Sequence, residues 1–69
     1  MSHEEDEYLK GFYHAQGVLM GMGYSGGTYM GDSSVMIDKA SRHVYRYDEM
    51  TMKYKSGFAS GIYSMHRCG

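Results

Sequence analysis

The residues that could catalyse a reaction or hold a metal ion are few and poorly spaced for either task. The one cysteine, Cys68, is the penultimate residue, where a nucleophile would lack a fixed geometry. The four histidines are His3, His14, His43 and His66, and none falls in HExxH or a similar ligand pattern. His66 and Cys68 alone cannot complete a tetrahedral site. We therefore expect no catalytic residue, no metal, no cofactor and no enzyme activity.

Anion binding is the second chemistry to consider. The glycine-rich run 21–31 lacks the Lys-Ser/Thr ending of a P-loop, and a flexible turn is its default interpretation. Backbone N–H groups at Gly26 and Gly27 could nevertheless face a phosphate. The alternative function is thus a homo-oligomeric module that binds a nucleotide or another anionic small ligand between subunits. Its predicted site comprises Gly26, Gly27, Tyr29, Arg42, His43 and Arg46.

Tyrosine and methionine are unusually frequent, with eight of each in 69 residues. A core this small cannot bury eight phenol rings with every hydroxyl group hydrogen-bonded, so several rings must lie at a surface. Tyrosine gives a large contact area at a low cost in rotamer entropy, and methionine gives adaptable apolar surface. The methionines fit an irregular core equally well. The tyrosines, in contrast, favour a binding surface.

Three candidate surfaces follow from this composition. The first carries Leu9, Tyr13 and Met20, and the second carries Met52 and Tyr63 beside Ala59; both favour protein contact or self-association. The third is a mixed basic and aromatic set that could stack bases and neutralise phosphates: Arg42, His43, Tyr45, Arg46, Tyr47, Lys53 and Lys55. A formal net charge of −1 lacks the basic footprint of a nucleic-acid binder, so we do not expect a nucleic-acid partner.

The first of these surfaces requires a helix, and residues 4–22 predict one. Acidic residues 4–7 suit the N-terminal end of the helix dipole, and Ser2 is a candidate cap. Gly23 is the predicted stop, with Gly21 as the alternative. One apolar stripe follows helical spacing, and a second, with Leu9, Tyr13, Gln16 and Met20, lies beside it. The first stripe comprises Tyr8, Phe12, Ala15, Leu19 and Met22.

Residues 49–66 predict a second helix, capped by Asp48. Gly57 and Gly61 are four residues apart at the edge of its apolar stripe, where another backbone could approach closely. Lysines and serines along this segment exclude a membrane-spanning helix, so we expect no membrane contact. The core stripe comprises Met50, Tyr54, Phe58, Ile62 and Met65.

Between these helices, residues 34–38 and 43–47 are rich in Val, Ile and Tyr and predict a β-hairpin. The competing interpretation is a helix over 33–43, capped by Ser33. With the hairpin, the expected fold is α+β. Its order is helix–β-hairpin–helix (αββα), with both helices packed on one face of a small antiparallel sheet.

A chain of 69 residues forms one small domain, residues 1–69, with little stability to spare. No internal disulfide can form with one cysteine, which is typical of a reducing, cytoplasmic setting. Residues 1–34 carry five acidic and one basic side chain, a net charge of −4. Residues 35–69 carry six basic and three acidic ones, a net charge of +3. This asymmetry permits pairing between subunits or with a charged partner, although the acidic cluster is explained more simply by its support of the helix start.

We therefore expect a small non-enzymatic regulatory or inhibitory protein that binds another protein and self-associates as a dimer or a larger oligomer. The predicted partner-binding residues are Leu9, Tyr13, Met20, Met52 and Tyr63. Compact chains without cofactors are frequent among phage and mobile-element factors that block a host protein. That frequency, rather than any residue of the chain, suggests such an origin.

Overall fold

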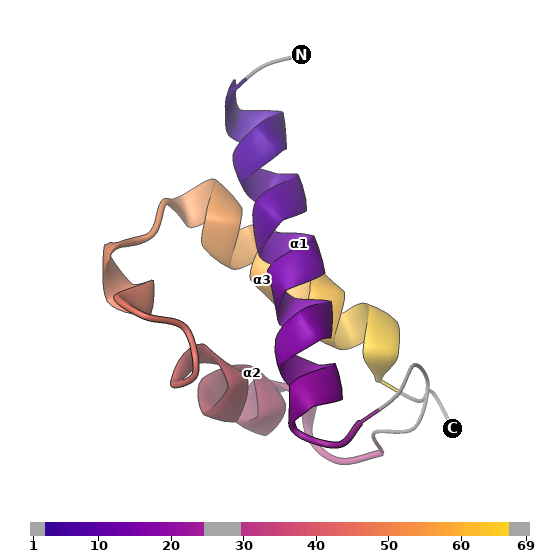
Figure 1. Ribbon diagram of the computed structural model, residues 1–69. Coiled ribbons are helices and arrows are strands. Elements are labelled where there is room, and N and C mark those ends of the chain that lie inside the picture. The colour runs from indigo at the N-terminus through magenta and orange to yellow at the C-terminus, as the bar shows by residue number, and fades with distance from the viewer. Residues whose placement is uncertain (1–2, 25–29, 67–69) are drawn as a thin grey trace.

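The computed structural model describes residues 3–24 and 30–66, and the regular elements in these ranges are helices. Helix α1 spans His3–Gly21, α2 spans Ser33–Ser41 and α3 spans Met52–Met65; a 3-10 turn, η1, covers Tyr47–Glu49 (Figure 1). No β-strand occurs in the described ranges, so the predicted α+β fold with an αββα order is wrong. The domain is a small helical globule, and its helices pack on one another rather than on a sheet.

Helix α1 confirms the helix expected at residues 4–22. It ends in a Schellman motif: the N–H of Tyr24 donates to the carbonyl of Leu19 at 3.0 Å, and the N–H of Gly23 donates to that of Met20 at 3.1 Å. Gly23 has φ = +99°, which glycine adopts without steric cost. The predicted stop at Gly23 is therefore confirmed. The predicted cap, Ser2, lies outside the described residues.

Helix α2 replaces the first strand of the expected hairpin, and residues 43–47 form turns rather than a second strand. Asp32 caps this helix, since its side chain accepts a hydrogen bond from the N–H of Ser34 at 2.9 Å. Met36 and Ala40, one turn apart, are buried, and Val44 one turn further on is buried as well. Burial at a spacing of four thus outweighs the strand propensity of Val and Ile. The competing interpretation, a helix over 33–43, agrees better with the observed α2 than the hairpin does. The cap of this helix is Asp32, however, rather than Ser33.

Helix α3 confirms the second expected helix, with a different start. Thr51, not Asp48, is the cap: it has extended backbone angles, and its hydroxyl oxygen accepts from the N–H of Tyr54 at 3.1 Å. Asp48 belongs to η1 instead. Four members of the expected core stripe are buried on α3, while Met50 precedes the helix and is half-buried. The buried four are Tyr54, Phe58, Ile62 and Met65.

Helices α1 and α3 cross with their backbones in close contact at glycine residues. A Cβ atom added to Gly57 would lie 2.7 Å from the carbonyl carbon of Tyr8 and closer still to its oxygen. A Cβ atom on Gly11 would lie 2.9 Å from the backbone nitrogen of Phe58. Real Cβ atoms do not come this close to a backbone, so only glycine fits at these places. The close approach predicted at Gly57 is confirmed.

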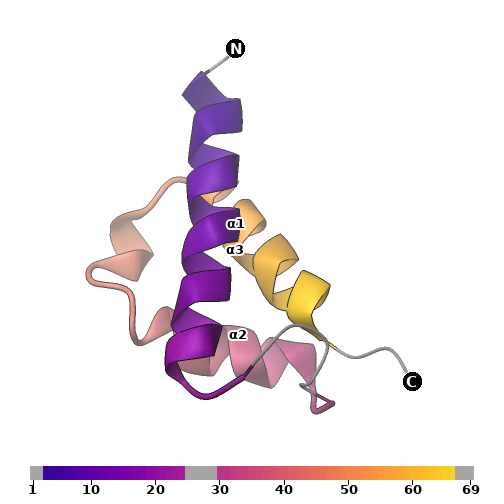
Figure 2. The same ribbon diagram turned by 45° about the vertical axis from the view of Figure 1, so that its right-hand side comes forward.

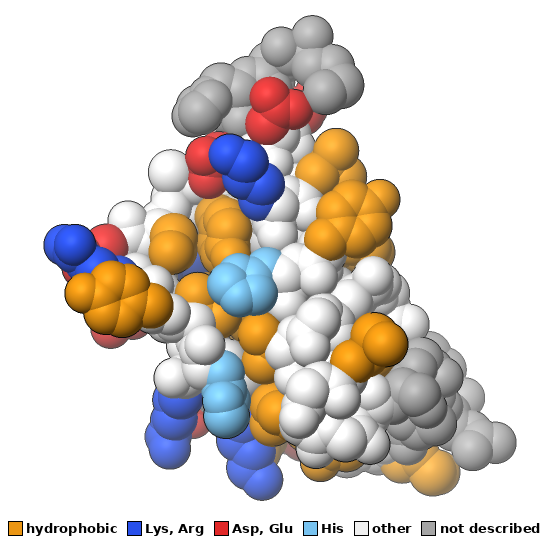
Figure 3. All heavy atoms as spheres, in the orientation of Figure 1, with side chains coloured by type: hydrophobic (Ala, Val, Ile, Leu, Met, Phe, Trp, Pro, Cys, Tyr) orange, Lys and Arg blue, Asp and Glu red, His pale blue; other side chains and the backbone are white. Residues whose placement is uncertain are grey.

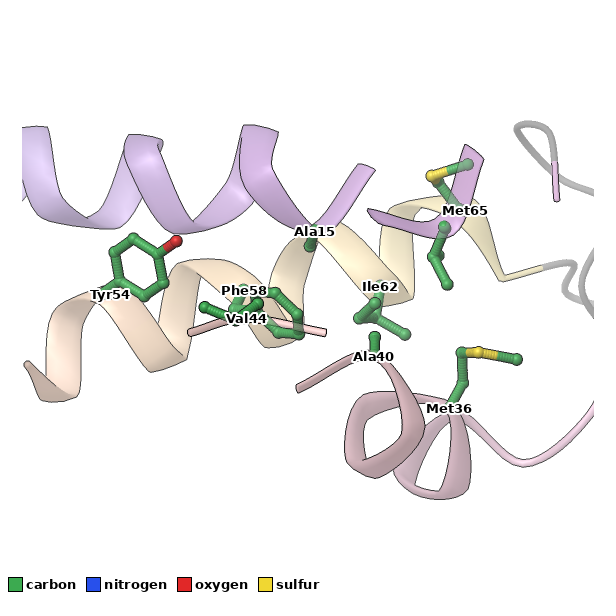
Figure 4. Close-up of a cluster of buried hydrophobic side chains, with 9 residues drawn as sticks. Ala15, Met36, Ala40, Val44, Tyr54, Phe58, Ile62 and Met65 are labelled. Atoms are coloured by element: carbon green, nitrogen blue, oxygen red, sulfur yellow. The ribbon is translucent and has the colours of Figure 1, made fainter. Parts of the chain in front are cut away.

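The core lies where α2 and the turn after it cover one side of the α1–α3 pair (Figures 1 and 2). Phe58 is fully buried at its centre, with the ring of Tyr47 tilted against it at 5.1 Å between centroids. Figure 4 shows side chains from α2, α3 and the segment at Val44 pointing toward one another beneath Ala15 of α1. The side of the α1–α3 pair away from α2 lacks such a cover within the described residues.

Candidate protein-binding surface

Four residues recur at intervals of four, three and four along α1 and form what we call the α1 stripe: Leu9, Tyr13, Gln16 and Met20. Tyr13 exposes 64% of its surface, Met20 65% and Leu9 42%. Leu9 precedes Val18, which packs against the core, by two and a half helical turns. The stripe therefore faces away from the core. Figure 3 shows hydrophobic side chains on the right-hand side of α1.

The same four-three-four spacing occurs on α3 in what we call the α3 stripe: Met52, Ser56, Ala59 and Tyr63. Met52 is 79% exposed and Tyr63 is 55% exposed. Tyr63 follows the buried Tyr54 by two and a half turns, so it lies on the opposite side of the helix from the α1 contact. The five predicted partner-binding residues are all exposed. Whether they bind a partner stays a prediction.

A line of hydrogen bonds fixes α1 and α3 against each other beside these stripes. The hydroxyl of Tyr8 donates to Oγ of Ser60 at 2.6 Å, and Nε2 of Gln16 donates to Oγ of Ser64 at 3.1 Å. Ser64 in turn donates to the carbonyl oxygen of Gly61 at 2.7 Å. Together with the glycine contacts, these bonds hold both stripes on a pre-formed support.

On the core side of the same helix pair, Tyr54 and His14 share a hydrogen bond between the phenol and Nδ1. Burial raises the pKa of the Tyr54 hydroxyl above its usual value, and the charges of Glu7 and Tyr47 raise it further. The phenol therefore stays protonated near neutral pH. This contact is a structural tie between α1 and α3, and none of the expected binding residues takes part in it.

The predicted anion site is only partly within the described residues. Gly26, Gly27 and Tyr29 lie outside them. Arg42 pairs with Asp38 of its own helix at 3.1 Å. The guanidinium of Arg46 donates twice to the carboxylate of Glu49.

These ion pairs bear on anion binding, because the side chains of Arg42 and Arg46 each already have a carboxylate partner three or four residues away. Arg46 also has φ = 57°, a left-handed conformation at the residue that precedes η1. His43 is exposed, and Lys55 lies 5.7 Å from the centre of the Tyr47 ring. Within the described part of the predicted anion site, both arginines are thus paired with carboxylates, and the nucleotide alternative stays a prediction.

Other kinds of site find little support in the described ranges. Residues 3–24 and 30–66 contain no group of three or more His, Cys, Asp or Glu side chains that could hold a metal ion, and they enclose no pocket. None of the helices in these ranges has the length and apolar character needed to cross a bilayer. Comparison of the chain with protein-family models, with curated proteins and with solved structures finds no match.

The structure also exposes large apolar residues beyond the five predicted partner-binding ones. Tyr45 is 84% exposed, Met30 68% and Val35 48%. We placed Tyr45 in a basic hairpin surface, but it lies in the turn after α2, and Val35 was assigned to the wrong element. The spacing of Met36, Ala40 and Val44 could have identified the buried side of α2, and with it the outward position of Val35.

Proposed function

We propose that this protein acts through contacts of the α1 and α3 stripes with other protein chains, as a regulator or inhibitor that does no chemistry of its own. One observation supports this proposal above the rest. Five large apolar or phenolic side chains lie exposed at helical spacing on two rigidly joined helices: Leu9, Tyr13, Met20, Met52 and Tyr63. The described residues that could do chemistry are scattered.

The exposed area is of the right size for such a function. The exposed fractions of the five residues add up to about three fully exposed residues. At about 200 Å² for each side chain, these five residues offer about 600 Å² of contact surface. A standard protein–protein interface buries about 800 Å² on each partner, so each stripe supplies the apolar centre of a contact that neighbouring residues complete.

The side-chain types point to the mode of binding. Tyr13 and Tyr63 combine a rigid ring with a hydroxyl that can pair at the rim of a contact, while Met20 and Met52 adapt to an irregular apolar cleft. Residues at four-three-four spacing on a helix are the anchors by which a helix occupies an apolar groove. We therefore propose that the protein inhibits its partner sterically, by filling a groove which that partner needs for another contact.

The test is comparative capture from a host lysate with three proteins. The α3 variant carries Met52→Glu and Tyr63→Glu, and the matched control carries Tyr45→Glu, which changes the most exposed tyrosine outside both stripes. We expect the wild type and the control to capture the same protein and the α3 variant to lose it. All three should keep the helical circular dichroism, because the changed residues are exposed. Equal capture by all three proteins would contradict the proposal.

A further inference from the structure

We propose that the α1 stripe is the contact for a second copy of this chain, which binds antiparallel to the first. This inference deepens the proposed function: it assigns the α1 stripe to self-association and leaves the α3 stripe for the other protein. The four-three-four spacing of the stripe is that of the seam between two long helices packed side by side. The structure adds that these positions are turned away from the protomer's own core.

Antiparallel pairing makes the stripe complementary to itself. With the twofold axis passing between residues 14 and 15, Leu9 packs against Met20 of the second copy, and Tyr13 faces Gln16 of the second copy. Gln16 uses Nε2 to bond Ser64 within its own chain, and its carbonyl oxygen can accept the hydroxyl of Tyr13 from the second copy. The four contact layers thus contain apolar pairs at the ends and phenol–amide pairs in the middle.

The distribution of charge selects this orientation. The first two turns of α1 carry Glu5, Asp6 and Glu7. A parallel dimer would place two such acidic clusters side by side, where like charges destabilise the pairing. An antiparallel dimer separates them by most of the helix, on the order of 25 Å at 1.5 Å per residue. The antiparallel arrangement also places the N-terminal end of each helix dipole beside the C-terminal end of the other, which is favourable.

Glycine at position 17 fits the same arrangement. Gly17 lies on α1 beside Tyr13, is exposed, and has nothing within 4 Å of the place where a Cβ atom would be. Gly11, Gly57 and Gly61, in contrast, are needed where the two helices of the protomer touch. At the edge of the α1 stripe, Gly17 lets the helix of a second copy approach closely. Because the stripe is short, we expect a reversible dimer in the micromolar range rather than an obligate one.

Sedimentation velocity across a concentration series tests the dimer directly. We expect the wild type to approach twice the 7.8 kDa chain mass as its concentration rises from about 1 μM to about 1 mM, the weak end of specific association. The variant Tyr13→Glu with Met20→Glu should remain at the chain mass over the whole range. The α3 variant, Met52→Glu with Tyr63→Glu, is the control and should dimerise like the wild type. A wild type that stays monomeric at 1 mM, or a loss of dimer in both variants alike, would overturn the proposal.

Disulfide trapping tests the orientation. In a Cys68→Ser background, Leu9→Cys and Met20→Cys are made as two separate proteins. Mixed under oxidising conditions, they should join to each other, while each alone should cross-link poorly. In the antiparallel dimer, two Leu9 positions are about 16 Å apart along the helix axis, beyond the reach of a disulfide. Efficient cross-linking of Leu9→Cys with itself would indicate a parallel pair and overturn the antiparallel arrangement.

The two proposals fail separately in these experiments. If the α1 variant is monomeric yet captures the partner as the wild type does, the two stripes have the separate tasks assigned here. If the wild type never dimerises but the α3 variant still loses the captured protein, the self-association inference falls and the proposed function stands. If dimerisation is confirmed while capture is equal for all variants, the proposed function falls instead.

Discussion

Replacing Gly57 by alanine should destabilise the protein strongly, although alanine is the better helix former. Its Cβ atom would lie 2.7 Å from the carbonyl carbon of Tyr8 and closer to the oxygen, and both are backbone atoms that cannot rotate away. Carbon atoms pack without strain at about 3.5–4.0 Å, so α1 and α3 must move apart by about 1 Å. That movement loosens the packing of Phe58 and stretches the bond from Tyr8 to Ser60.

The magnitude follows from three contributions. Overpacking of a tight contact costs about 1–3 kcal/mol, and loss of an interhelical hydrogen bond costs about 1 kcal/mol more. The helix propensity of alanine returns about 1 kcal/mol. The net loss of about 1–3 kcal/mol is a large fraction of the roughly 3–10 kcal/mol expected for a 69-residue domain. Each kcal/mol lowers the melting temperature by about 4–8 °C in a domain of this size.

Gly17→Ala is the matched control, because it makes the same substitution in α1 at a place where nothing lies within 4 Å of the new methyl group. It should stabilise the monomer by up to about 1 kcal/mol. Thermal and urea unfolding followed by far-ultraviolet circular dichroism measure both effects at a concentration where the wild type is monomeric. If Gly57→Ala were as stable as the wild type, or if the two variants changed stability alike, the close crossing of α1 and α3 would be refuted.

Two further predictions concern helix capping and acid stability. Thr51→Ala removes the cap of α3 and should cost about 1 kcal/mol in urea unfolding, whereas Thr51→Ser should cost little. Hydrogen bonds from Ser34 lower the pKa of Asp32, and those from Arg46 lower the pKa of Glu49. Such carboxylates stabilise the fold above their unfolded pKa, so their contribution should be constant near neutral pH and decline below the ordinary pKa of 3.8 for Asp32 and of 4.5 for Glu49. Melting temperatures measured from about pH 7 to about pH 2 test this prediction. The variant Asp32→Asn should lose less melting temperature at the low-pH end than the wild type does. An unchanged pH profile would contradict the stabilising role of the Asp32 carboxylate.

The long helices could be predicted from the sequence because their signals are local. The apolar period of 3.6 residues and the glycine stop at Gly23 both act within a few residues, and the structure follows them. The spacing of Gly57 and Gly61 likewise predicted a close backbone approach, and in the structure both glycines lie against backbone atoms of α1. The expectation that several tyrosines lie at the surface is confirmed too, since Tyr13, Tyr45 and Tyr63 are exposed.

The segment from residue 33 to residue 47 could not be predicted by the same reasoning. Val35 and Ile37 favour a strand locally, and the capping by Asp32 together with the burial of Met36 and Ala40 against the core outweighs that preference. The sheet is absent from the described ranges, and the two arginines expected on its hairpin pair with neighbouring carboxylates. The exposed stripes were predictable, because they need only the period of each long helix.

Methionine oxidation by peroxide, read by mass spectrometry, tests the central claim that the two stripes are contact surfaces. Met20 and Met52 lie in the stripes, while Met30 is similarly exposed outside them and serves as the internal reference. The account predicts that Met20 oxidises more slowly as the concentration of the free protein rises, and that Met52 becomes protected in the captured complex. Equal oxidation of all three methionines in both states would contradict it.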